Sequence, residues 1–256
     1  MQLPQFNVAK DKIKELSKSL MQDKYEKILQ DLMELESENP DDMRVKQKIA
    51  ELLYKLGRID EAMTHLMAIV DFFEKGEFIL KAIKASKNIL KIRPELIDYN
   101  IKLGALYLKI GMINESANQY RIAITQYAHA GDITNTLKYS KILVKIDPSN
   151  DNKIKLAEIY QTAGMATEAM GLYKELAKEA RQKKDYEKLL HYYDLLLPHD
   201  SKNIALIKDV CILNLRNQRP DSAIRILEQY SQTTNPEFKD LIQKALLMKE
   251  ALRKKK

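Results

Sequence analysis

Apolar residues recur along the chain at the three- and four-residue spacing of amphipathic helices, and short polar breaks interrupt this pattern at regular intervals. Between positions 45 and 56 the apolar residues are Val45, Ile49, Leu52, Leu53 and Leu56, which fall on one helix face and stop before a glycine. Stretches of this kind follow one another to the end of the chain. The pattern therefore predicts an all-α protein of about fourteen helices and no strands.

The breaks between these stretches repeat with a constant period. Prolines stand at Pro40, Pro94 and Pro148, which gives two steps of 54 residues. Glycines stand at 57, 111 and 164, with steps of 54 and 53, and Asn217 takes the place expected of a fourth glycine. Because two independent kinds of break share one period, the sequence predicts an internal repeat.

Each repeat is expected to hold three helices, two flanking the glycine and a third that ends at the proline. The first of these turns lies in the segment IAELLYKLGRIDEAM, which begins at Ile49. On this basis residues 1–256 form a single helical-repeat domain. Its expected parts are a helix pair at 1–39, three-helix units at 40–93, 94–147 and 148–200, a degenerate fourth unit at 201–234, and a capping helix with a basic tail at 235–256.

Small residues recur at two matched places in the helices that flank the glycine. The first helix of each pair carries Gly104, matched by Ala50 and Ala157. The second helix carries a small residue at Ala62, Ser116, Ala169 and Ser222. A small side chain lets two helices approach closely, so these positions are predicted to be helix contacts.

These residues stand at the signature spacing of a known repeat family. The middle unit has Leu103, Gly104, Tyr107, Gly111, Ser116, Tyr120 and Ala123, and the first and third units match it in phase. The chain thus resembles the tetratricopeptide repeat (TPR) family. The resemblance implies a right-handed superhelical solenoid of antiparallel helices whose groove binds peptides or partner domains. The chain departs from the family in that proline ends every third helix rather than every second.

Composition indicates where such a protein works. The chain has 43 basic and 36 acidic residues, interspersed except for a basic run from Arg253 to Lys256, which we read as a solubilising helix end. No apolar run is long enough to span a membrane, and residues 1–14 lack the features of a secretory signal. We expect a soluble, cytoplasmic protein of bacterial type. The single cysteine, Cys211, lies in an apolar helical pattern and is expected to be a buried, inert thiol.

The sequence contains no recognisable catalytic or cofactor-binding motif. The four histidines do not fall in HExxH spacing, and neither a glycine-rich phosphate loop nor a GxSxG elbow is present. His191, Asp194 and His199 are close in sequence, but we interpret this trio as coincidence, because a zinc site needs three or four convergent ligands. We therefore expect no enzyme activity, no cofactor and no metal.

The candidate partner-binding residues lie on the first helix of the second and third units. They are Asp98, Ile101, Ala105, Leu108 and Lys109, followed by Asp151, Ile154 and Glu158. In the middle unit the apolar strip of Ile101, Ala105 and Leu108 has a charged residue at each end, as an anchor pocket with a polar rim would. The matching face of the first unit, Arg44 to Lys55, is interpreted as a solvated helix surface.

Two alternative functions remain beside a protein-binding scaffold. Helical-pair repeats also occur in RNA-binding modules that read one base per repeat. The matched positions here hold Arg44, Asp98, Asp151 and Ile204, which form no code, so nucleic acid is disfavoured. The compact three-helix unit also looks like bacterial scaffolds of polarity or motility complexes that contact small GTPases. The partner and the oligomeric state stay open.

Overall fold

The computed structural model describes the backbone of residues 4–230 and 236–254 and the side chains of residues 18–230 and 238–254. Every regular element in these ranges is a helix. The chain forms two compact units, residues 1–130 and 131–256, and each is described by itself. The division falls between α6 and α7.

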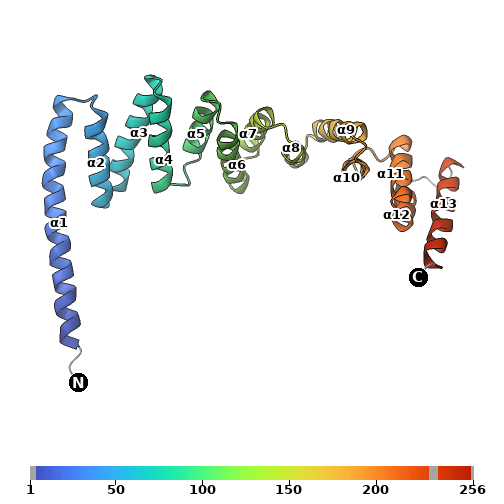
Figure 1. Ribbon diagram of the computed structural model, residues 1–256, viewed down its shortest axis with the longest axis horizontal. Coiled ribbons are helices and arrows are strands. Elements are labelled where there is room, and N and C mark those ends of the chain that lie inside the picture. Colours follow the sequence, from blue (N-terminus) through green and yellow to red (C-terminus); the bar gives the residue numbers. More distant parts are fainter. Residues whose placement is uncertain (1–3, 231–235, 255–256) are drawn as a thin grey trace. The chain divides into compact units, whose positions relative to one another are not determined.

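The first unit consists of six helices, and each of them packs on the next (Figure 1). They are α1 (Pro4–Glu38), α2 (Met43–Lys55), α3 (Ile59–Lys75), α4 (Ile79–Ile92), α5 (Ile97–Lys109) and α6 (Ile113–His129). Helix α1 extends far beyond the end of α2. The expectation of a helix pair at 1–39 was wrong, because a single continuous helix of 35 residues occupies this segment.

The second unit consists of seven helices. They are α7 (Ile133–Ile146), α8 (Asn150–Thr162), α9 (Ala166–Gln182), α10 (Tyr186–Leu196), α11 (Ile204–Arg216), α12 (Pro220–Tyr230) and α13 (Pro236–Arg253). The described part of the chain thus has thirteen helices and no strand, which confirms the all-α prediction. The difference from fourteen is the undivided α1.

The turns inside the helix pairs follow the predicted period. Gly57, Gly111 and Gly164 adopt left-handed backbone conformations with φ of 78°, 75° and 75°. In the fourth pair the left-handed residue is Gln218, with φ of 56°, while Asn217 has φ of −84° and ends α11. The expectation for Asn217 was therefore wrong by one position, and the step from Gly164 is a regular 54 residues.

Each unit has a core of its own. In the first unit Ile69, Val70 and Ile89 are buried with Tyr99, so helices α3, α4 and α5 share one apolar cluster. In the second unit Tyr173 is completely buried and belongs to a cluster that runs from α8 to α13. Ile49, Leu52 and Leu53 of the first periodic stretch are buried as expected, whereas Val45 and Leu56 are half-buried.

Candidate partner-binding groove

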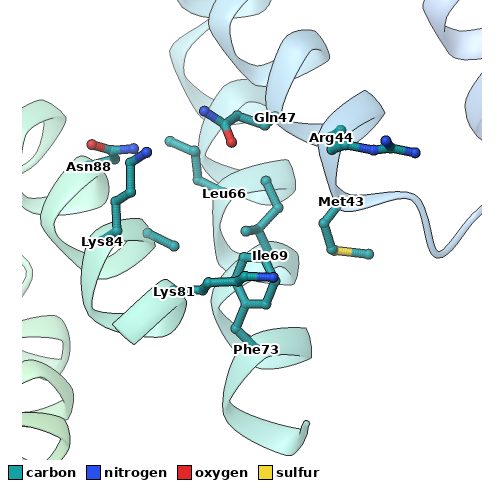
Figure 2. Close-up of a pocket in the computed structure, with 10 residues that line it drawn as sticks. Met43, Arg44, Gln47, Leu66, Ile69, Phe73, Lys81, Lys84 and Asn88 are labelled. Atoms are coloured by element: carbon teal, nitrogen blue, oxygen red, sulfur yellow. The ribbon is translucent and has the colours of Figure 1, made fainter. Parts of the chain in front are cut away.

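The first unit contains a groove with α3 as its floor and α2 and α4 as its walls (Figure 2). Helix α3 packs on both α2 and α4, whereas those two helices make no contact with each other among the described residues. Two hollows, of about 260 and 380 Å³, share Gln47, Leu66 and Asn88. They therefore form one continuous groove.

The floor of the groove is apolar and its walls are largely polar. Leu66, Ile69 and Phe73 of α3 line the floor. The α2 wall holds Met43, Arg44, Gln47, Ala50, Glu51 and Tyr54, and the α4 wall holds Lys81, Lys84, Ala85, Asn88, Lys91 and Ile92. Leu66 and Ile69 are buried between their neighbours and still face the hollow, so they offer an apolar contact to an entering side chain.

The lysines on the α4 wall form no ion pair with the described residues. Lys81, Lys84 and Lys91 lie on one face of α4, because their spacings of three and seven residues are close to whole helical turns. Among the described residues no carboxylate lies within ion-pair distance of any of these three ammonium groups. The Lys81 ammonium instead stands over the Phe73 and Phe78 rings, at 5.5 and 5.0 Å from their centroids. The α4 wall is therefore a row of uncompensated positive charge.

The charges on the α2 wall are already neutralised by neighbours. Arg44 Nη2 donates to Asp42 Oδ2 at 2.8 Å, and this hydrogen bond lowers the pKa of Asp42 to about 2. Lys48 Nζ lies 2.9 Å from Glu51 Oε2 and lowers the pKa of that carboxyl. The net charge that a ligand meets in the groove thus comes from α4.

A small residue on α4 keeps the groove open. Ala85 is 6% exposed and lines the hollow. The repeat places Ala85 at the position of Tyr192 on α10, and Met43 at the position of Asn150 on α8. In the second unit Tyr192 is 2% exposed, and its hydroxyl accepts a 3.2 Å hydrogen bond from Asn150 Nδ2. A tyrosine thus fills, between α8 and α10, the space that Ala85 leaves free between α2 and α4.

The predicted contact residues lie on two helices. On α5, Asp98, Leu108 and Lys109 are exposed, with Leu108 at 40%, whereas Ile101 and Ala105 are half-buried. On α8, Asp151 and Glu158 are exposed and Ile154 is half-buried. The structure brings the first five together on one helix of the first unit and the other three on one helix of the second. Their role in binding stays a prediction.

Among the tyrosines outside the repeat signature, the structure separates five by exposure. Tyr54 is 50% exposed and lines the groove. Tyr99 and Tyr192 are buried, and Tyr127 and Tyr139 are half-buried. Only Tyr54 therefore offers a freely exposed ring.

In the second pair the helices contact each other at the matched small residues. Ser116 Oγ of α6 donates to the Gly104 carbonyl of α5 at 2.8 Å. A Cβ added to Gly104 would lie 3.1 Å from Cε2 of Tyr120, so this crossing requires glycine or a small shift of the ring. In the fourth pair the buried crossing residues are Cys211 and Ala223, which corrects the expectation for the half-buried Ser222.

The matched small residues are buried in all four pairs, and they share one period with the turns and with the helix starts. The pattern matches the tetratricopeptide signature. The chain is a TPR-like helical repeat.

No protein-family model matches this chain, and no curated protein matches it either. Solved structures resemble it at low identity. The P58(IPK) TPR domain is 17% identical, covers 92% of this chain and 87% of its own length, and has a TM-score of 0.26. The Rap conjugation gene regulator of plasmid pLS20 in complex with the Phr* peptide is 17% identical, with coverages of 96% and 72% and a TM-score of 0.34. The TPR-like assignment rests on the period, turns and crossings of the chain itself.

The α4 residues of the groove were missed at the level of sequence. The TPR signature describes two helices, and the wall lysines stand on the third helix, which the signature does not include. The spacing of Lys81, Lys84, Asn88 and Lys91 is a signal that could have identified a polar stripe on one helix face. The face of α2 from Arg44 to Glu51, interpreted as merely solvated, forms the opposite wall.

The remaining candidate chemistry forms no site in the described residues. These residues hold no group of three or more metal-ligating side chains, and His199 Nε2 lies 2.8 Å from Gln161 Nε2. Cys211 is fully buried, and burial raises the pKa of its thiol to about 12, so it stays protonated at neutral pH. None of the described helices has the length and apolarity needed to cross a membrane. Lys255 and Lys256 of the basic tail lie outside the described residues.

Proposed function

We propose that this chain is a non-enzymatic scaffold that binds a peptide, a helix or a partner domain, and that the α2–α4 groove is a binding surface. The observation that carries the proposal is the continuous groove with an apolar floor and exposed polar walls, kept open by Ala85. Such a surface suits an apolar anchor surrounded by polar contacts, which is how peptide-binding grooves obtain affinity and specificity.

The groove is also the right size for part of a chain. Along α2 it runs from Met43 to Tyr54, a helix length of about 16 Å at 1.5 Å per residue. An extended peptide covers that length with about five residues. Each hollow is near the lower end of small-molecule pocket volumes, so it accommodates single side chains.

The apolar strip on α5 is the second candidate surface. Leu108 is 40% exposed and stands beside the exposed Lys109, so the strip keeps an apolar side chain accessible next to a charge. Ile101 and Ala105 are half-buried, whereas the groove encloses hollows of about 260 and 380 Å³ between three helices, in which a side chain can be surrounded. We therefore place the groove first.

The test is a selection of binding peptides from a random twelve-residue display library against the full chain, followed by affinity measurements on variants. Met43→Asn combined with Ala85→Tyr copies the Asn150–Tyr192 pair into the groove. We expect this variant to lose at least about tenfold in affinity, since each tenfold corresponds to only about 1.4 kcal/mol. Ala85→Ser, which leaves the groove open, should bind as the original chain does.

The α5 strip supplies the counter-test. Ile101→Asp combined with Leu108→Asp should leave binding of the selected peptides unchanged, and circular dichroism should confirm that the variant remains helical. Peptides that bind the filled-groove variant normally but fail on the α5 variant would overturn the groove and place the site on α5.

A further inference from the structure

We propose that the α2–α4 groove selects an acidic segment of a partner protein, with carboxylates against the α4 lysines and an apolar side chain on the α3 floor. This inference rests on the proposed function and adds to it the chemistry of the partner. Its basis is the contrast between the lysines of the groove and the lysines that the fold uses elsewhere.

Two lysines with little exposure elsewhere in the chain, Lys102 and Lys153, are each paired with two carboxylates. Lys102 Nζ lies 2.9 Å from Asp71 Oδ1 and 2.8 Å from Glu74 Oε2. Lys153 Nζ lies 2.8 Å from Glu175 Oε1 and 2.9 Å from Glu179 Oε1. These pairs tie neighbouring helices together, so their charges are neutralised within the protein.

The groove lysines are exposed, and what sets them apart is that they lie in a row on one face of α4 beside the groove. Lys84 lines one hollow and Lys91 lines the other, and neither has a carboxylate partner among the described residues. Lys81, one turn before Lys84, is held in place above two phenylalanine rings. Like charges on one helix face repel one another, and no acid in the described part of the chain pairs with these lysines to offset that repulsion. Carboxylates of a bound partner would supply the missing opposite charge.

The opposite wall determines on which side the partner's acids lie. Arg44 is paired with Asp42 and Glu51 is paired with Lys48, so the α2 wall offers no unpaired charge. A segment with carboxylates on one side therefore fits with that side toward α4. The rise of α4 places Lys84 about 10 Å from Lys91 along the helix axis. An extended segment matches this separation with acids about three residues apart.

A protein segment fits the groove better than single-stranded RNA does. The floor presents the aliphatic side chains Leu66 and Ile69, and the Lys81 ammonium stands over the Phe73 ring, which is therefore not a free surface for base stacking. Phosphates are spaced regularly along a strand, and those passing the α2 wall would find no unpaired cation there, because Arg44 is paired with Asp42. A peptide can place an uncharged residue there.

The experiment extends the library selection with a charge-matched pair of variants. Lys84→Gln combined with Lys91→Gln removes two charges from the groove. Lys24→Gln combined with Lys27→Gln removes two charges from exposed positions on α1, and neither of these lysines has an ion-pair partner among the described residues. A twelve-residue oligouridine serves as the nucleic-acid probe.

We expect the peptides that depend on an open groove to be enriched in Asp and Glu. Their affinity should fall at least about tenfold with the Lys84/Lys91 variant, should change less than about twofold with the Lys24/Lys27 variant, and should weaken with added salt.

Other outcomes overturn the inference in distinguishable ways. Groove-dependent peptides that are neutral or basic, and that bind the Lys84/Lys91 variant with unchanged affinity, would refute the acidic partner and leave the proposed function intact. Library peptides that all bind the filled-groove variant normally would refute the groove itself. The groove would be assigned to nucleic acid if oligouridine bound the original chain tightly and the filled-groove variant weakly, while no library peptide lost affinity for that variant.

Discussion

Helices α2–α4 of the first unit and α8–α10 of the second have the same order, matched start positions and the same turn geometry, yet they present different surfaces. Between α2 and α4, Met43 and Ala85 leave an open groove. At the matched positions Asn150 and Tyr192 join α8 to α10 through a buried ring and a hydrogen bond. The repeat thus supplies a common frame, and side-chain size at one position of the third helix decides whether that frame is core or groove.

The same two regions differ in how they use lysine. Lys153 on α8 is held between two glutamates of α9, whereas Lys84 and Lys91 on α4 have no acid partner in the described part of the chain. A paired lysine stabilises the fold. A row of unpaired lysines beside a groove instead produces a positive electrostatic potential that attracts an acidic ligand. The comparison therefore separates residues that the repeat needs from residues available for binding.

The largest expected effect comes from removing the Tyr192 ring, which fills the space between α8 and α10. Tyr192→Ala should lower the free energy of unfolding by about 3–5 kcal/mol, since it empties a buried site and leaves Asn150 without its partner. Ala85→Tyr should cost less than about 1.5 kcal/mol, because the groove has room for the ring. Urea denaturation followed by circular dichroism measures both. Equal losses in the two variants would contradict the distinction between core and groove.

The second test concerns the paired lysine. Hydrogen bonds to Glu175 and Glu179 raise the pKa of Lys153, and the hydrogen bond from Lys153 lowers the pKa of Glu179. The contribution of Glu179 is therefore present above its ordinary pKa of about 4.3 and is lost as the pH falls through the lowered value. The contribution of Lys153 is present below its ordinary pKa of about 10.4 and is lost as the pH rises through the raised value.

Replacement of this lysine should make stability less dependent on pH. Lys153→Met is expected to cost about 1 kcal/mol at pH 7 and to flatten the decline of the unfolding free energy on the acid side. Lys84→Gln combined with Lys91→Gln should cost nothing measurable at pH 7, because no internal pair is lost. The measurement is a series of urea denaturation curves from pH 3 to pH 8. A destabilised Lys84/Lys91 variant would show that these lysines serve the fold.

The sequence predicted the helix pairs well because their determinants are local. The glycines at 57, 111 and 164 terminate helices through their left-handed conformation, and the small crossing residues recur in phase with them. The N-terminal helix was divided in error, although residues 5–39 contain neither glycine nor proline to end it. In the fourth pair the left-handed residue is a glutamine, which carries no turn signal, so the assignment moved one position to Asn217.

The groove could not be predicted from the sequence, for a physical reason. Its floor comes from α3 and its walls from α2 and α4, so it depends on how three helices pack rather than on the spacing within any one of them. Ala85 and Tyr192 are both ordinary residues on the inner face of a helix. Only their different surroundings show that one leaves space and the other fills it.

The smallest expected effect extends the comparison of the two units to their turns, Gly57 in the first and Gln218 in the second. Gln218 holds φ at 56°, a conformation that strains a residue with a Cβ, whereas its neighbour Asn217 has φ of −84° and ends α11. Gln218→Gly should relieve that strain and raise the unfolding free energy by about 0.5 kcal/mol, after the greater flexibility of glycine in the unfolded chain offsets part of the gain. Asn217→Gly adds the same flexibility without any relief, so it should lower stability by about 0.5 kcal/mol. Thermal and urea denaturation of the two single variants, measured side by side, should therefore give shifts of opposite sign. A stabilising Asn217→Gly paired with a destabilising Gln218→Gly would show that the turn of this helix pair lies one residue earlier than the structure places it.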